Sequence, residues 1–180
     1  LKLLIENQET VFSIRQISIK RKINYKSAYI NLKCLAEEGV VNLKKQGNMT
    51  ICSFNHKFNE SVFHVEYARL QRLLINKNFM VIYNRLAKIN EQFILLLFGS
   101  YSRNQQTKMS DIDLLAISNN PKPIEDQINL IPRNIHLTPV TYNEFKLMLK
   151  SKEFTVVSEA IKHNILLFGA EDYYRLMNNA

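Results

Sequence analysis

The chain has 180 residues, 46% of them hydrophobic and 22% charged, which is a balance typical of a soluble globular protein. No apolar run reaches the ~18 residues that a membrane-spanning helix needs, and the short apolar start at residues 1–5 lacks a small-residue cleavage site, so we expect a cytoplasmic protein with no membrane partner. Residues 1–58 hold ten Lys/Arg and four Glu, so this segment has a net charge of +6 in a chain whose net charge is +8. Such a concentration of positive charge predicts a polyanionic partner. The alternative is a basic surface that is merely solvated.

Two helices are predicted early in the chain. Ser13 is a good N-cap residue for a helix over residues 14–21. Asn24 is a second cap residue, and it opens a helix over residues 25–38 with apolar positions at helical spacing. Gly39 ends this second helix, because glycine readily adopts the conformation that follows a helix. The pattern therefore predicts a helix, a short turn and a second helix.

A β-hairpin is predicted next. Residues 40–44 and 49–54 are rich in β-formers and flank a polar turn at residues 45–48, which gives the hairpin a basic tip. The two cysteines, Cys34 and Cys52, have no metal-ligand spacing, and we expect both to be buried packing thiols. The order of elements over residues 1–57 resembles the winged helix-turn-helix domain of bacterial and archaeal regulators.

That resemblance implies binding to double-stranded DNA. The second helix of such a pair normally enters the major groove, and here its outer stripe consists of Lys26, Tyr29 and Lys33. Lys44 and Lys45 on the hairpin would reach phosphates or the minor groove. The alternative is that these side chains solvate the surface and that the hairpin docks a protein. Because a winged helix that reads a palindrome usually works as a dimer, we expect a homodimer.

The middle of the chain is predicted to be helical. Residues 59–77 carry apolar side chains at one helical stripe, which consists of Phe63, Tyr67, Leu70 and Leu74. This stripe predicts either plain core packing or pairing with a second copy. We assign residues 58–78 as a connecting helix. Asn78 is a cap residue for a further helix, whose apolar face is Phe79, Ile82, Leu86 and Ile89.

The segment that carries chemistry lies between two predicted strands. Residues 93–98 are entirely apolar and predict a buried strand, which Gly99 and Ser100 follow at once. A second strand begins near Ser110. Since residues two apart share a face of a strand, Asp111 and Asp113 are expected to point the same way. Two adjacent carboxylates repel each other, and this is the arrangement that holds Mg²⁺ through oxygen ligands.

This combination of a strand, Gly-Ser, an arginine three residues on and then Ser-Asp-Ile-Asp-Leu resembles the DNA polymerase β-like nucleotidyltransferase superfamily. The likeness covers residues 79–180, and it is to the small prokaryotic proteins, of an archaeal type, that are encoded beside a partner with an all-helical fold. It implies an α+β, two-domain chain, in which a winged helix-turn-helix precedes a nucleotidyltransferase fold with a mixed β-sheet flanked by helices.

The resemblance also implies roles for individual residues. Gly99 would let the backbone approach a nucleoside triphosphate (NTP), and Ser100 would hold a terminal phosphate. Asp111 and Asp113 would be the catalytic acids and would bind Mg²⁺. Arg103 would either neutralise phosphate charge or brace the loop. The acceptor would be a hydroxyl on a protein or a small molecule.

One departure from the family concerns a third carboxylate on a neighbouring strand. The matching strand covers residues 135–140, and its site-facing positions are His136 and Thr138. Pro139 predicts an edge strand or a strand end. Glu144 and Glu153 fall in predicted helices, where they are poor replacements. His136 could act as a ligand or a base, or could simply be structural.

Further helices and a strand complete the prediction. Helices are expected from residue 141 or 143 to about 150 and from about 154 to 163, followed by a strand at 165–168 and a last helix in which Tyr173 and Tyr174 pack. Two functions follow from different classes. Either the protein is an active Mg²⁺-dependent nucleotidyltransferase that also binds DNA, or it is a transcriptional regulator whose nucleotidyltransferase domain has lost activity.

Overall fold

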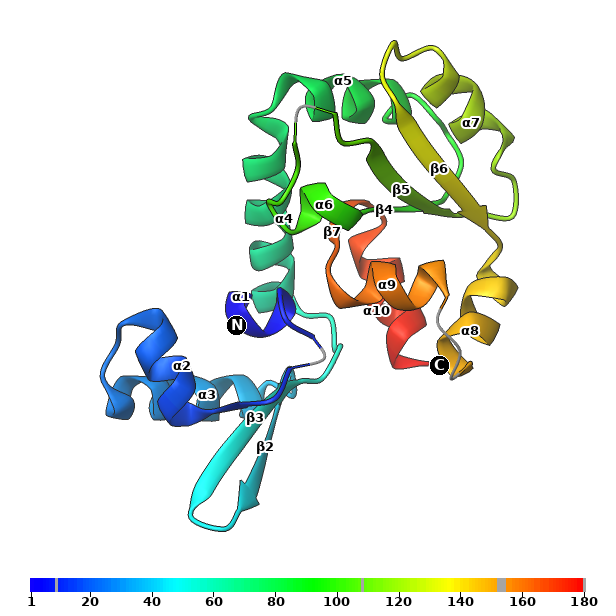
Figure 1. The fold of residues 1–180 in the computed structure, drawn as a ribbon. Coiled ribbons are helices and arrows are strands. Elements are labelled where there is room, and N and C mark those ends of the chain that lie inside the picture. Colours follow the sequence, from blue (N-terminus) through cyan, green and yellow to red (C-terminus); the bar gives the residue numbers. More distant parts are fainter. Residues whose placement is uncertain (9, 108, 152–154, 180) are drawn as a thin grey trace. The chain divides into compact units, whose positions relative to one another are not determined.

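A computed structural model describes residues 1–8, 10–107, 109–151 and 155–179 (Figure 1). The chain divides into two compact units, Leu1–Val65 and Glu66–Ala180. The division falls inside helix α4 (Glu60–Leu74), within the stretch expected to connect two domains. None of the described helices is both long and apolar enough to cross a membrane.

Among its described residues, the first unit contains three helices, the first part of α4 and a small sheet. Its elements are α1 (Lys2–Ile5), β1 (Phe12–Ser13), α2 (Ile14–Arg21), α3 (Tyr25–Glu37), β2 (Val41–Gln46) and β3 (Met49–Phe54). The strands form an antiparallel sheet in the order β1-β3-β2. The two helices and the hairpin predicted from the sequence are confirmed. Strand β2 runs on to Gln46, however, so the turn is only Gly47 and Asn48.

The predicted caps of α2 and α3 are present. The Ser13 hydroxyl accepts a hydrogen bond from the Gln16 N–H while the Gln16 side chain accepts one from the Ser13 N–H, which forms a reciprocal capping box. The Asn24 side chain accepts from the Ser27 N–H at 2.7 Å. The expectation for the cysteines is half wrong, because Cys52 is buried but Cys34 is exposed on α3. Cys34 lies two residues from the buried Leu32, off the apolar face of the helix.

In its described residues, the second unit contains a four-stranded mixed sheet and six helices besides part of α4. Its elements are α5 (Lys77–Leu86), β4 (Ile94–Phe98), α6 (Gly99–Ser102), β5 (Ile112–Ile117), α7 (Lys122–Asn129), β6 (Ile135–Val140), α8 (Tyr142–Lys150), α9 (Val156–Lys162), β7 (Ile165–Phe168) and α10 (Ala170–Asn178). The strand order is β6-β5-β4-β7. β5 and β6 are parallel, while β4 is antiparallel to both of its neighbours.

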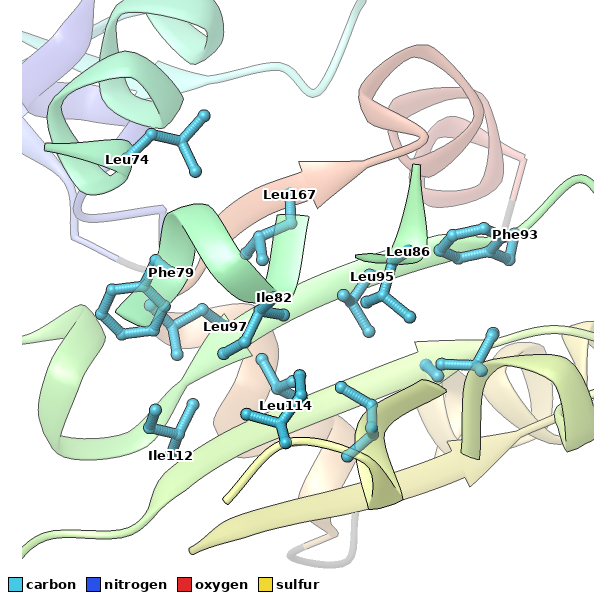
Figure 2. Close-up of a cluster of buried hydrophobic side chains, with 14 residues drawn as sticks. Leu74, Phe79, Ile82, Leu86, Phe93, Leu95, Leu97, Ile112, Leu114 and Leu167 are labelled. Atoms are coloured by element: carbon cyan, nitrogen blue, oxygen red, sulfur yellow. The ribbon is translucent and has the colours of Figure 1, made fainter. Parts of the chain in front are cut away.

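One face of this sheet packs against α5 and α7 in a buried hydrophobic cluster (Figure 2). The labelled members are Leu74, Phe79, Ile82, Leu86, Phe93, Leu95, Leu97, Ile112, Leu114 and Leu167. Ile112 and Leu114 of β5 belong to this cluster. Because side chains alternate across a strand, the residue that lies between them points to the opposite face of the sheet. That face therefore receives Asp113, and α9 and α10 pack on β4 there.

Strand β6 is an edge of the sheet, as Pro139 predicted. Pro139 pairs with Ala116 of β5 in the parallel register. Proline has no N–H to donate, so it is compatible with a strand that has a neighbour on one side only. The prediction of a strand over residues 135–140 is confirmed to the residue.

Two predictions for the central helices are wrong in detail. Helix α5 begins at Lys77 and is capped by the Asn76 side chain rather than by Asn78. On α4, the core-packing alternative for the apolar stripe is wrong for Phe63 and Tyr67, which are 48% and 52% exposed, while pairing with a second copy stays a prediction. Leu74 at the end of the stripe is buried. The buried face of α4 instead contains charged residues, which no hydrophobic pattern reveals.

These charged residues form a buried polar network in the second unit. Arg69 donates two hydrogen bonds to the Glu66 carboxylate, at 2.9 and 2.7 Å. The Tyr174 hydroxyl donates to Glu66 at 2.5 Å, and Arg69 also donates to the carbonyl oxygen of Asn164. Both charged side chains are less than 10% exposed. Their mutual pairing offsets the cost of removing two charges from water.

The C-terminal elements agree with the sequence. Thr141 caps α8 through a reciprocal capping box with Glu144, and the predicted start of the next helix at Phe154 lies outside the described residues, as does Glu153. Tyr173 and Tyr174 are fully buried, which confirms their packing role.

Candidate active site

The site begins at the turn that follows β4. Five buried residues form this strand, and Gly99 then adopts a φ of +69° and opens the short helix α6. Ser102 fixes the turn, because its Oγ lies 2.9 Å from the carbonyl oxygen of Gly99 and 2.9 Å from that of His163, to either of which its single hydrogen can be donated. The turn is thus closed on itself and attached to the end of α9.

Asp113 lies directly beside this turn. In the sheet register it is flanked by Phe98 on β4 and by His136 on β6. A Cβ atom added to Gly99 would overlap Oδ2 of Asp113 and would lie 3.1 Å from its Cγ. Position 99 therefore needs glycine for two reasons, its positive φ and the carboxylate that fills the adjacent space.

The surroundings of Asp113 disfavour its charged form. Partial burial raises the pKa of this carboxyl, and the negative charges of Asp111 and Glu159 raise it further. His136 acts in the opposite direction, since its Nδ1 lies 3.7 Å from Oδ1 of Asp113. A bound cation would therefore stabilise the charged form of Asp113 against the charges of the two nearby acids.

The structure brings some of the predicted site residues together. Asp111 is exposed and lies one residue before β5, near enough for its charge to act on Asp113. Ser100 is half-buried in α6, and its carbonyl oxygen accepts a hydrogen bond from the Gln105 N–H at 2.9 Å. His136 occupies the position on β6 that faces Asp113, so no carboxylate stands at that place in the sheet.

Sequence reasoning missed Glu159 on α9. Its Oε1 lies 3.5 Å from Nη1 of Arg103, and the two side chains are 34% and 36% exposed. The residues are far apart in sequence and belong to different elements, so no spacing rule relates them. A carboxylate therefore does reach the vicinity of Asp113, but from a helix and already paired with an arginine.

A bound Mg²⁺ would find few protein ligands here. Among the residues that the structure describes, no three His, Cys, Asp or Glu side chains gather closely enough to hold a metal ion. Mg²⁺ in nucleotide sites is commonly bound by one or two carboxylates together with substrate phosphates and waters. Asp111 and Asp113 could supply the two carboxylates of such a site. A bound cation would also offset the repulsion between them, which contributes to the raised pKa of Asp113.

A cavity of about 560 Å³ lies at the other end of the sheet. Among its lining residues are Gln92, Asn119, Tyr142 and Asp172, at the ends of the strands opposite to Gly99. The Gln92 amide donates to Asp172 at 2.9 Å, so part of its polar lining is already satisfied. None of the predicted site residues is among its lining residues.

The basic residues singled out in the first unit are all solvent-exposed. Lys26, Tyr29 and Lys33 lie on α3, and Tyr29 is 45% exposed. Lys33 is 3.9 Å from Glu37 one turn further on, an exposed pair that water screens. Lys44 and Lys45 lie on β2 next to the hairpin turn.

Comparison with known families agrees with this geometry. Residues 83–163 match the model of the nucleotidyltransferase domain family. The matched segment contains β4, the Gly99 turn, Asp111, Asp113 and the strand that carries His136. It supports a nucleotidyltransferase domain in the second unit, and the α+β architecture with its mixed sheet fits that fold. Searches of curated proteins and of solved structures gave no match.

Proposed function

We propose that the second unit binds a nucleoside triphosphate with Mg²⁺ at the Gly99 turn and transfers a nucleoside monophosphate to a hydroxyl acceptor. The observation that carries this proposal is the contact between Gly99 and the Asp113 carboxylate. It places an acid that could hold Mg²⁺ directly beside the glycine turn that would cradle the phosphates. The family match at residues 83–163 supports the same reaction class.

Each residue has a defined role in this proposal. The turn from Gly99 to Ser102 cradles phosphate oxygens through the Ser100 hydroxyl and backbone N–H groups. Asp111 and Asp113 would hold Mg²⁺, which supplies positive charge to the phosphates during in-line transfer. Arg103 adds a fixed positive charge at the same turn. The acceptor hydroxyl belongs to a protein, such as a helical partner encoded nearby, or to a small molecule.

The position of His136 favours a second candidate function. Activation of the attacking hydroxyl normally uses a base within hydrogen-bond reach, and a carboxylate on β6 would meet that requirement. Here the residue beside Asp113 is a histidine that is 70% exposed. The alternative is therefore a regulator in which the nucleotidyltransferase domain binds nucleotide without turnover.

For the first unit, we propose binding to double-stranded DNA as a winged helix-turn-helix domain. The net charge of +6 over residues 1–58 and the exposed Lys26, Tyr29 and Lys33 on α3 support this role. The exposed lysines of β2 would contact phosphates. Neutralisation of ~4–6 phosphates would give a log–log salt slope of roughly −4 to −5, and a homodimer would read a palindromic site. A flat salt dependence would count against DNA binding.

One experiment tests catalysis and reveals the acceptor. Radiolabelled ATP, GTP, CTP and UTP are supplied separately with Mg²⁺ and cell lysate to the wild-type chain and to the Asp111→Asn/Asp113→Asn variant. Label that the wild type transfers and the double variant does not supports the enzyme. Mg²⁺-dependent NTP binding without transfer supports the regulator, and no binding of any NTP overturns the proposal for this site.

A further inference from the structure

Arg103, at the end of α6, forms an ion pair with a residue of helix α9. Its Nη1 lies 3.5 Å from Oε1 of Glu159, and about a third of each side chain remains exposed. The guanidinium has five N–H donors, and this single approach leaves most of them available. The pair therefore orients the arginine without consuming its capacity to bind an anion.

A second contact joins the same two elements. Ser102, the neighbour of Arg103, lies 2.9 Å from the carbonyl oxygen of His163, the residue that ends α9. Glu159 lies within α9, and His163 is the residue that directly follows its last turn. Consecutive residues of the turn thus meet α9 at two points.

Helix α9 is itself firmly placed. Thr155 and Ser158 form a reciprocal capping box at its start, and Val157 and Ala160 are fully buried on its inner side. A helix that is capped and packed in this way provides a rigid support for the side chains on its remaining face. Glu159 is one of these side chains.

We propose that Glu159 is a positioning residue, which holds the Arg103 guanidinium beside the Gly99 turn so that it meets the phosphates of a bound triphosphate. This inference rests on the proposed nucleotide-binding function of the same site. A free arginine side chain loses conformational freedom when it binds an anion, and holding it in place beforehand reduces that loss. A carboxylate that only added negative charge would repel the phosphates instead, so the two roles predict opposite effects of its removal.

The test is a set of binding titrations with the full chain and Mg²⁺, using each of the four NTPs and the matching nucleoside monophosphates. We expect Glu159→Gln to weaken binding of the preferred NTP about three- to tenfold and to leave the monophosphate almost unchanged. Arg103→Gln should weaken NTP binding at least as much. The double variant should bind no more weakly than Arg103→Gln alone, because Glu159 acts through the arginine.

Glu171→Gln is the matched control. Glu171 forms an exposed pair with Arg175 on α10, at 2.6 Å, and the variant should keep wild-type NTP affinity. Thermal unfolding of every variant checks that an affinity change is not a loss of fold. Unchanged or tighter NTP binding by Glu159→Gln, or additive effects in the double variant, overturns the inference alone. Absence of NTP binding by the wild type overturns the proposed function and this inference together.

Discussion

The carboxylate of Asp113 fills the space that a side chain at Gly99 would need. Asp113 on β5 pairs with Phe98, the last residue of the antiparallel strand β4, and Gly99 follows Phe98 directly. The sheet register therefore sets their contact. A side chain at position 99 would therefore meet two obstacles, the positive φ of the backbone and the neighbouring Asp113 carboxylate.

Gly99→Ala should lose nucleotide binding as well as stability. Its φ of +69° disfavours alanine by about 1–3 kcal/mol, and the added methyl group must displace the Asp113 carboxylate. Gly47→Ala is the matched control, because Gly47 has a φ of +56° and nothing within 4 Å of an added Cβ. We expect similar backbone strain in the control but wild-type NTP affinity, measured by titration, with stability measured by urea unfolding. Wild-type affinity in Gly99→Ala would contradict the assigned site.

Asp113→Asn should stabilise the metal-free protein at neutral pH. Burial, with the charges of Asp111 and Glu159, raises the pKa of the Asp113 carboxyl in the folded state. The folded protein thus binds this proton more tightly than the unfolded chain does, so stability is highest below the unfolded pKa of about 3.9 and falls as pH rises through the folded pKa. Asparagine carries no such charge, so Tm of the variant should exceed that of the wild type near pH 7.

The pH series provides the control for this prediction. Near pH 4 the wild-type carboxyl is partly protonated, so the difference in Tm between the two proteins should shrink there. The measurement is thermal unfolding without Mg²⁺ from about pH 4 to pH 7. A difference that stays constant over this range would refute the raised pKa.

Arg69→Met should destabilise the second unit by about 3–5 kcal/mol, because it leaves the buried Glu66 without its partner. Glu66→Gln/Arg69→Met should lose clearly less, since glutamine is neutral and can still accept the hydrogen bond from the Tyr174 hydroxyl. Urea unfolding of both variants gives the comparison. An equal loss in the two would mean that packing, rather than the unpaired charge, determines the effect.

Lys26→Ala/Lys33→Ala should weaken binding to duplex DNA and lower the magnitude of the log–log salt slope by roughly 2, if each lysine neutralises one phosphate. Fluorescence anisotropy with a labelled random duplex at several salt concentrations measures both quantities. Lys2→Ala is the control, because Lys2 on α1 belongs to the same unit and pairs with Glu6, which directly follows that helix. A variant with the wild-type salt slope would exclude these two lysines from the interface.

Short-range rules predicted most of the elements. The apolar run of β4, the caps Ser13, Asn24 and Thr141, and the edge strand marked by Pro139 all lie where expected. Each depends on residues within a few positions of one another, so the sequence contains the whole signal. The Gly99 turn and Asp113 were predicted by the family resemblance, and the sheet register explains why they meet.

Long-range pairing was not predicted. Glu159 reaches Arg103 only because α9 packs on β4, and nothing local to either residue indicates this. The buried face of α4 was not predicted for a related reason. Glu66 and Arg69 are polar in sequence, but they satisfy each other in the interior, so a hydrophobicity pattern chose Phe63 and Tyr67 instead.

The proline in the outer strand of the sheet has a consequence for self-association. An exposed strand edge offers a row of N–H and C=O groups to which another chain can add a strand. Pro139 removes one N–H donor from β6, the outermost strand on that side, so a foreign strand would find a gap in its hydrogen-bond ladder. The same residue that marks the boundary of the sheet thus makes it a poor template for aggregation.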